Sequence, residues 1–176
     1  RGMDQKIHND TVNKTYTVFS LWDTFRAAHP LYTIIEQERT IAFINTFLKH
    51  YDLGGRLPVW ELTSNETECM IGYHSVSVIT DAFNKGLVDF DTNKAFKAMV
   101  YGANLDHFGL DSYKKYGYIR AGDEAESVSK TLEYAYDDWC IAQFAKANGD
   151  TKIYDELIQR AQSYKNIFDP NSTFMR

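Results

Sequence analysis

The sequence has no long apolar run and no concentration of basic residues. No stretch approaches the roughly 18 apolar residues of a membrane-spanning helix, so we expect no membrane span. The 19 Lys and Arg residues are outnumbered by 24 Asp and Glu residues, which gives a formal net charge of −5. Because the basic residues form no cluster that could follow a line of phosphates, neither nucleic acid nor an anionic membrane surface is an expected partner.

The motifs of several enzyme and metal-binding classes are missing as well. There is no HExxH run, no Cys/His ligand spacing and no EF-hand loop, so we expect no metal site in these residues. The GxSxG, P-loop and dinucleotide-binding fingerprints are also absent, and no signal peptide is recognisable. The two cysteines, Cys69 and Cys140, lie far apart in the sequence and are expected to be small buried apolar groups.

Aromatic residues and helical periodicity are what the sequence does contain. Aromatic residues make up 15% of the 176 residues, with 12 Tyr and 11 Phe. A chain of this length forms one domain or a piece of a larger one. Apolar spacing and capping residues predict an all-α fold of five helices arranged as antiparallel hairpins. The expected helices run from about residue 31 to 52, from 70 to 85, onward from a cap at Asp91, from 124 or 127 to 147, and from 150 or 151 to about 168.

The remaining segments are expected to be non-helical. Residues 16–19 form a short β-prone stretch. Residues 56–69 and 106–123 are expected to be loops.

Two dense runs, residues 19–31 and 57–74, combine aromatic rings, carboxylates and a histidine. That mixture suits a polar, ring-shaped ligand such as a sugar, which needs a flat apolar surface and a few directed hydrogen bonds. Trp22 and Asp23 are the strongest candidates, because an indole can stack on a pyranose ring and a carboxylate can accept hydrogen bonds from two vicinal hydroxyls. The alternative is a core Trp22 with Asp23 capping the following turn, which spacing alone slightly favours.

Glu66 and His74 are the candidates in the second run. Glu66 and Glu68 precede an expected helix N-terminus, where first-turn carboxylates are stabilised by the helix dipole. That structural role is favoured for Glu68, whereas Glu66 could also be an acid or a sugar-binding carboxylate beside Trp60 and His74. His74 is expected one turn into a buried helix, where a lone histidine is more often a core residue than a catalyst.

The expected helix of residues 127–147 is apolar nearly all round and therefore buried on most sides. It nevertheless carries Glu133, Asp137 and Asp138, and carboxylates are rarely buried without partners. Glu133 and Asp137 share one face of this helix. These carboxylates could bind a ligand or pair with an Arg from a neighbouring element, and the sequence leaves both alternatives open.

Four long runs give the chain a more specific resemblance. They are FSLWDTFRAAHPL, LPVWELTSNETECMIGYHSVSVITDAFNKG, SVSKTLEYAYDDWCIAQFAKANG and YKNIFDPNSTFMR. Together, and in this order over residues 1–176, they resemble glycoside hydrolase family 92. That family consists of calcium-dependent, inverting, exo-acting α-mannosidases, many of them α-1,2-specific.

The resemblance implies that the chain is part of a larger catalytic domain. In this family an (α/α)6 toroid follows a β-sandwich domain, so residues 1–176 would be the N-terminal part, about half, of the toroid. The general acid, the general base and the calcium ligands are expected beyond Arg176, and no catalytic or metal-binding residue is expected within this chain. Trp22 and Asp23 match the WD pair that contacts mannose in the −1 subsite, whereas Glu66, His74 and Asp138 receive no role from the resemblance.

The parent protein is then expected to remove terminal mannose from α-mannosides at a periplasmic, cell-surface or secreted location, while the chain alone is inactive. Two alternatives are a non-catalytic carbohydrate-binding module and a helical interaction module. Open apolar faces are expected to pair with a second copy or with the missing half of the domain.

Overall fold

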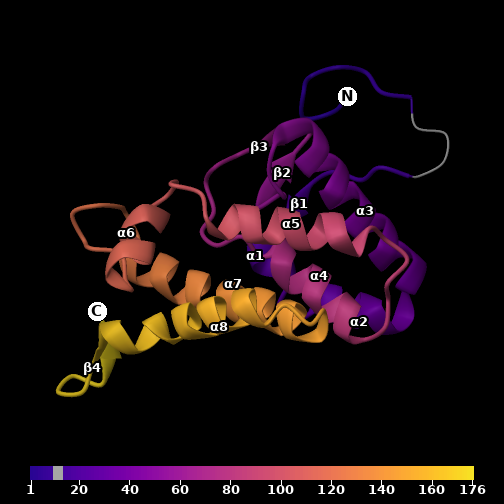
Figure 1. Ribbon diagram of the computed structural model, residues 1–176. Coiled ribbons are helices and arrows are strands. Elements are labelled where there is room, and N and C mark those ends of the chain that lie inside the picture. Colours follow the sequence, from indigo (N-terminus) through magenta and orange to yellow (C-terminus); the bar gives the residue numbers. More distant parts are fainter. Residues whose placement is uncertain (10–13) are drawn as a thin grey trace. The chain divides into compact units, whose positions relative to one another are not determined.

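The computed structural model describes residues 1–9 and 14–176. The chain divides into two compact units, Arg1–Gly102 and Ala103–Arg176 (Figure 1). Eight α-helices and five very short strands occur in the described residues, so the expected all-α fold class is confirmed.

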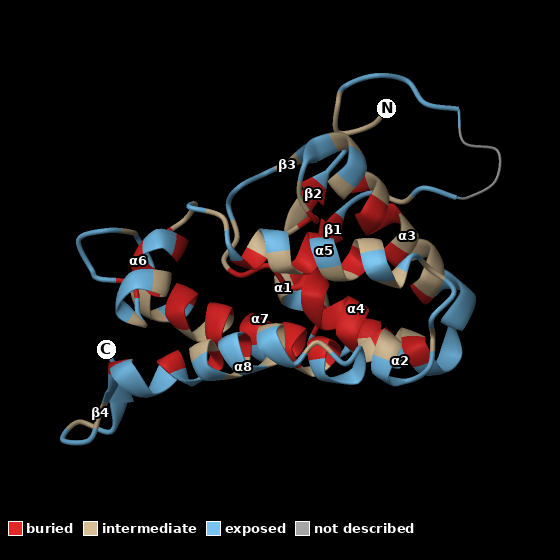
Figure 2. Cartoon of the chain, in the orientation of Figure 1, coloured by how far each residue is buried: buried red, intermediate tan, exposed pale blue. Residues whose placement is uncertain are grey.

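The first unit contains five helices and a small antiparallel sheet. Helices α2, α3 and α4 pack against one another, and fully buried side chains such as Ile44, Phe47 and Ile79 form the centre of this core. Figure 2 shows that α4 is buried along most of its length. The helices are α1 (Leu21–Thr24), α2 (Ala28–Ile35), α3 (Gln37–Gly54), α4 (Ser75–Asn84) and α5 (Thr92–Ala103).

The helix boundaries agree only in part with those predicted from the sequence. One long helix after residue 31 was expected, but Glu36 adopts φ −142° and ψ 55°, which separates α2 from α3. The stop near Gly55 is confirmed, since that glycine takes the left-handed conformation with φ 83°. The cap at Asp91 is also confirmed, because its carboxylate accepts a hydrogen bond from the Lys94 amide at 2.9 Å.

A three-stranded sheet replaces the loop expected at residues 56–69. The order is β1-β2-β3, and Ser20 pairs with Trp60 while Glu61 pairs with Glu66. The turn between β2 and β3 uses Thr63 and Ser64, both with positive φ. Hairpin turns of this kind normally carry Asn-Gly or Asp-Gly, and Thr63-Ser64 is not a recognisable turn signal. The strands are β1 (Phe19–Ser20), β2 (Trp60–Leu62) and β3 (Asn65–Glu66).

The second unit is dominated by two helices that pack along each other (Figure 1). Helix α7 spans Ser127–Ala147 as expected, and α8 spans Thr151–Arg160 before a 3-10 helix covers Ala161–Ile167. Asp150 caps α8 by accepting the Ile153 amide at 3.0 Å, which confirms the predicted cap. The unit ends in a short hairpin, β4 (Phe168–Asp169) and β5 (Phe174–Met175).

One expected loop of this unit contains a helix. Within residues 106–123 lies α6 (Leu110–Tyr116), bounded by Gly109 and Gly117, which both adopt left-handed φ values of 79° and 71°. Two turns are too short to give a recognisable apolar period, and the flanking glycines are typical of a loop.

Helix α7 is not apolar on all sides as expected. Lys130, Asp137 and Asp138 are buried, whereas Tyr136 and Trp139 are 38% and 46% exposed. The buried charges are tolerated because partners satisfy them, as the Asp138 ion pair described below illustrates.

Candidate functional site

Trp22 and Asp23 lie on α1, a single helical turn that directly follows β1. Leu21 anchors this turn because its side chain is fully buried and its amide donates to the Val59 carbonyl at 3.3 Å. Trp22 is half-buried and Asp23 is exposed. The turn therefore fixes one residue in the core and presents the next two at the surface.

Neighbouring side chains restrain both candidates. The Arg26 guanidinium lies 5.1 Å from the centre of the Trp22 ring and 4.6 Å from that of Phe25, within the range of cation–π attraction. The Ser20 hydroxyl donates a hydrogen bond to the Asp23 carboxylate. A restrained indole beside an exposed carboxylate can stack on the C–H face of a sugar and accept hydrogen bonds from its hydroxyls.

Glu66 is close to this turn, but its carboxylate bonds to the backbone. It accepts the amides of Val59, Trp60 and Thr67 at 2.8, 3.0 and 3.1 Å. The expectation that Glu66 and Glu68 precede a helix is wrong, because the next helix, α4, begins only at Ser75. Glu68 forms an ion pair with Arg56 instead.

His74 lies at the N-cap of α4 rather than one turn inside it, and it is fully buried. Its ring stacks on Phe25, with centroids 4.2 Å apart and planes inclined by 15°. Phe25 is the C-cap of α1, so this stack joins the end of α1 to the start of α4. The structure thus links His74, through Phe25, to the turn that carries Trp22 and Asp23, while His74 itself is buried.

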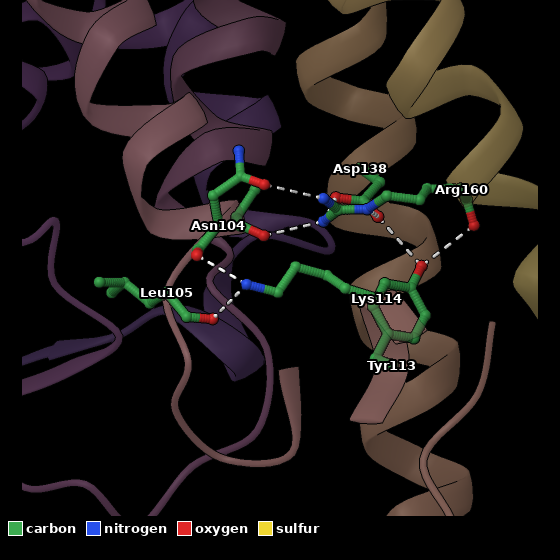
Figure 3. Close-up of polar contacts among 7 residues, drawn as sticks. Asn104, Leu105, Tyr113, Lys114, Asp138 and Arg160 are labelled. Carbon is green, nitrogen blue, oxygen red and sulfur yellow. Dashed lines mark hydrogen bonds and ion pairs between the residues drawn. The ribbon is translucent and has the colours of Figure 1, made fainter. Parts of the chain in front are cut away.

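Asp138 belongs to the second unit, where Arg160 and Tyr113 surround it (Figure 3). Arg160 binds both carboxylate oxygens, through Nε at 2.9 Å and Nη2 at 2.8 Å. The Tyr113 hydroxyl donates to the same carboxylate at 3.0 Å, and burial together with the Asp138 charge raises the pKa of Tyr113. Of the two alternatives left open by the sequence, pairing with an Arg is the one observed for Asp138.

The same Arg160 guanidinium also binds Ala103 and Asn104, the first two residues of the second unit. It donates to the Ala103 carbonyl at 2.9 Å and to the Asn104 side-chain oxygen at 3.2 Å. Lys114 contacts the carbonyls of Asn104 and Leu105 at 2.7 and 3.1 Å (Figure 3). These contacts indicate that Asp138 contributes to the architecture of the second unit.

Glu61 is a notable residue that the sequence analysis did not single out. It is fully buried in β2, and its carboxylate accepts hydrogen bonds from Thr17, Val18 and Ser64. One feature of the sequence could have pointed to Glu61: it is a lone charged residue between Trp60 and Leu62, inside a short stretch of otherwise apolar residues.

Two negative observations apply to residues 1–9 and 14–176. Within these residues, no group of three or more His, Cys, Asp or Glu side chains is arranged to hold a metal ion, so we assign no calcium ligand to them. None of their helices is long and apolar enough to cross a membrane.

Comparison with known proteins identifies the family. The sequence profile of the glycosyl hydrolase family 92 catalytic domain matches residues 1–176. A family GH92 alpha-mannosidase of Bacteroides thetaiotaomicron, solved in complex with mannoimidazole, is 46% identical with a TM-score of 0.95 over 100% of this chain and 24% of its own. An inverting GH92 mannosidase of the same bacterium is 38% identical with a TM-score of 0.87 over 93% of this chain and 23% of its own.

A curated relative gives a more distant match. An uncharacterized secreted glycosidase of Arthroderma benhamiae is 29% identical over 143 residues, which cover 72% of this chain and 18% of the relative. The fold and the matched profile define a glycoside hydrolase catalytic domain. The chain belongs to glycosyl hydrolase family 92, and it spans about a quarter or less of the length of the relatives it matches.

Proposed function

We propose that this chain supplies a sugar-contacting wall to an α-mannosidase that removes terminal mannose from α-mannosides. The observation that carries the proposal is the restrained pair on α1, a half-buried Trp22 next to an exposed Asp23. The 46% identity to a mannosidase solved with mannoimidazole supports mannose as the sugar. In this role Trp22 packs against the C–H face of the ring, and Asp23 accepts hydrogen bonds from two hydroxyls.

Hydrolysis itself needs groups that we do not assign within these residues. An inverting glycosidase uses an acid and a base about 6.5–9.5 Å apart on opposite faces of the sugar. We propose that both, together with the calcium ligands, lie in other parts of the full-length enzyme, and that these helices form about half of an (α/α)6 toroid. The name of the Arthroderma relative, a secreted glycosidase, supports a location outside the cytoplasm.

The test is mannose release by the full-length gene product and its variants. Asp23→Ala should lower kcat/KM at least 100-fold, because it removes directed contacts that position the sugar. Trp22→Phe should lower kcat/KM less, because a smaller ring keeps part of the stacking surface. Asp89→Ala is the matched control, since this carboxylate is also exposed and lies in the same unit.

Unchanged kcat/KM in both site variants would refute the role of Trp22 and Asp23. Mannose binding without any hydrolysis would instead favour a carbohydrate-binding module. Mannose release that stops when EDTA is added and resumes when calcium is restored would support the proposed calcium requirement.

A further inference from the structure

Glu61 is a buried carboxylate whose hydrogen bonds are all directed at the chain around the candidate site. The Thr17 hydroxyl donates to it at 2.9 and 3.0 Å, and the Val18 amide donates at 3.0 Å. The Ser64 amide, in the turn between β2 and β3, donates to the other oxygen. A fully buried carboxylate is costly unless such donors satisfy it, so its position and theirs are strongly coupled.

The chain bends sharply where Glu61 holds it. Val18 has φ 67°, a left-handed conformation that a β-branched residue rarely adopts. Its side chain is 54% exposed, so core packing does not explain this conformation. The hydrogen bond from the Val18 amide to Glu61 does explain it, because the bend points that amide at the buried carboxylate.

The bend leads directly to Trp22 and Asp23. Phe19 pairs with Glu61 itself, and Ser20 pairs with Trp60. The Leu21 amide then bonds to the Val59 carbonyl, and α1 begins. The direction in which α1 leaves the sheet is therefore set by an unbroken series of contacts that starts at the Glu61 carboxylate.

We propose that Glu61 is a positioning residue for the sugar-contacting pair: its carboxylate fixes the bend at Val18 and, through β1, the placement of Trp22 and Asp23. The part that concerns sugar rests on the proposed function. The part that concerns the placement of Trp22 does not.

The first experiment measures placement on the chain itself. With ¹⁵N-labelled tryptophan, Glu61→Gln should shift the indole N–H resonance of Trp22, because one acceptor oxygen becomes a donor facing backbone amides. The resonance of Trp139 in the second unit serves as the internal reference and should not move. A Trp22 resonance that stays in place in folded Glu61→Gln would overturn the proposal.

The second experiment measures function in the full-length gene product. Glu61→Gln should lower kcat/KM about 10-fold, and the loss should fall below twofold in an Asp23→Ala background, because contacting or coupled residues are not additive. Thr131→Val is the control for general destabilisation, since Thr131 is a buried hydrogen-bonded residue of the second unit. It should leave kcat/KM unchanged at a comparable loss of stability.

A milder variant covers the case in which Glu61→Gln does not fold. Thr17→Val removes one donor to Glu61 and the acceptor of the Thr63 amide, at 2.9 Å, and should lower kcat/KM about threefold. The positioning role would be overturned if Glu61→Gln lowered kcat/KM as much in the Asp23→Ala background as in the wild type. It would also be overturned if Thr17→Val had wild-type kcat/KM. If Asp23→Ala itself has no effect, the proposed function fails, and the resonance of Trp22 alone decides the inference.

Discussion

Gly72 shows how a single residue determines the packing of the buried His74 ring. It has φ 80°, and a Cβ added here would lie 2.5 Å from the His74 Nε2 atom. The His74 ring cannot easily retreat, because it is fully buried and stacked on Phe25. The glycine is therefore required both by its backbone conformation and by the space that the imidazole fills.

Gly72→Ala should lower the free energy of unfolding by roughly 2–4 kcal/mol, from the left-handed strain and the forced shift of His74. Urea denaturation of the chain measures this. Gly102→Ala is the matched control, since nothing lies within 4 Å of a Cβ there and alanine is the better helix former by about 0.5–1 kcal/mol. Equal stability of the two variants would contradict this account of Gly72.

His29 makes the first unit sensitive to pH. Burial lowers its pKa from 6.5 to about 4, so the folded chain keeps this imidazole neutral while the unfolded chain protonates it below pH 6.5. The stability that depends on the neutral form is complete above pH 6.5 and is lost as the pH falls toward 4.

Between pH 7.5 and pH 5, His29 should contribute a loss of about 2 kcal/mol in the free energy of unfolding, from a shift worth about 1.4 kcal/mol per pKa unit. Urea titrations of wild type and His29→Gln at the two pH values measure the contribution as a difference. If both proteins lose the same stability between these pH values, His29 is not the responsible group.

At the scale of elements, helix periodicity and capping residues predicted the long helices and their caps. The short strands, the tight turns and the break between α2 and α3 were not predicted. Helix α7 and the caps at Asp91 and Asp150 carry local signals, so they could be located without the structure. The break at Glu36 and the turn at Thr63 could not, because these residues have ordinary side chains in backbone conformations that tertiary contacts impose. Glu66 shows the same limit, since its partners come from across a sheet that the sequence did not reveal.

The buried ion pair between Asp138 of α7 and Arg160 of α8 should be important for stability. Arg160→Met leaves the fully buried Asp138 carboxylate without its cation and should destabilise the chain by about 3–5 kcal/mol. Lys94→Met is the control, because the ion pair between Lys94 and Asp52 is well exposed. Its loss should lower the free energy of unfolding by less than about 1 kcal/mol. Thermal unfolding of both variants tests the difference, and similar melting temperatures would contradict it.

At the scale of the whole molecule, apolar side chains remain at the surface of both units. In the first unit Leu31, Ile34 and Ile35 of α2 are 49%, 71% and 61% exposed, and in the second unit Tyr136 and Trp139 of α7 are also exposed. The prediction that α7 presents an open apolar face therefore applies to these two aromatic residues, while its Ala135 and Phe144 are buried.

We expect the isolated chain to self-associate at micromolar concentration, because apolar surface gains roughly 25 cal/mol for each Å² that is buried. Light scattering should give a mass above the 20.3 kDa of one chain. Ile34→Ser combined with Trp139→Ser should shift the mass toward that value. A monomer in the wild type, with no binding of an apolar dye, would contradict the expectation.

The short length of α1 has a consequence for how the molecule is made. A four-residue helix is far too short to be stable alone, and its anchoring partners, Val59 and Trp60, come about 40 residues later in the chain. We therefore expect Trp22 and Asp23 to reach their folded conformation during synthesis only after β2 has followed. The surface that we propose for sugar binding therefore cannot form from its own segment of the chain alone.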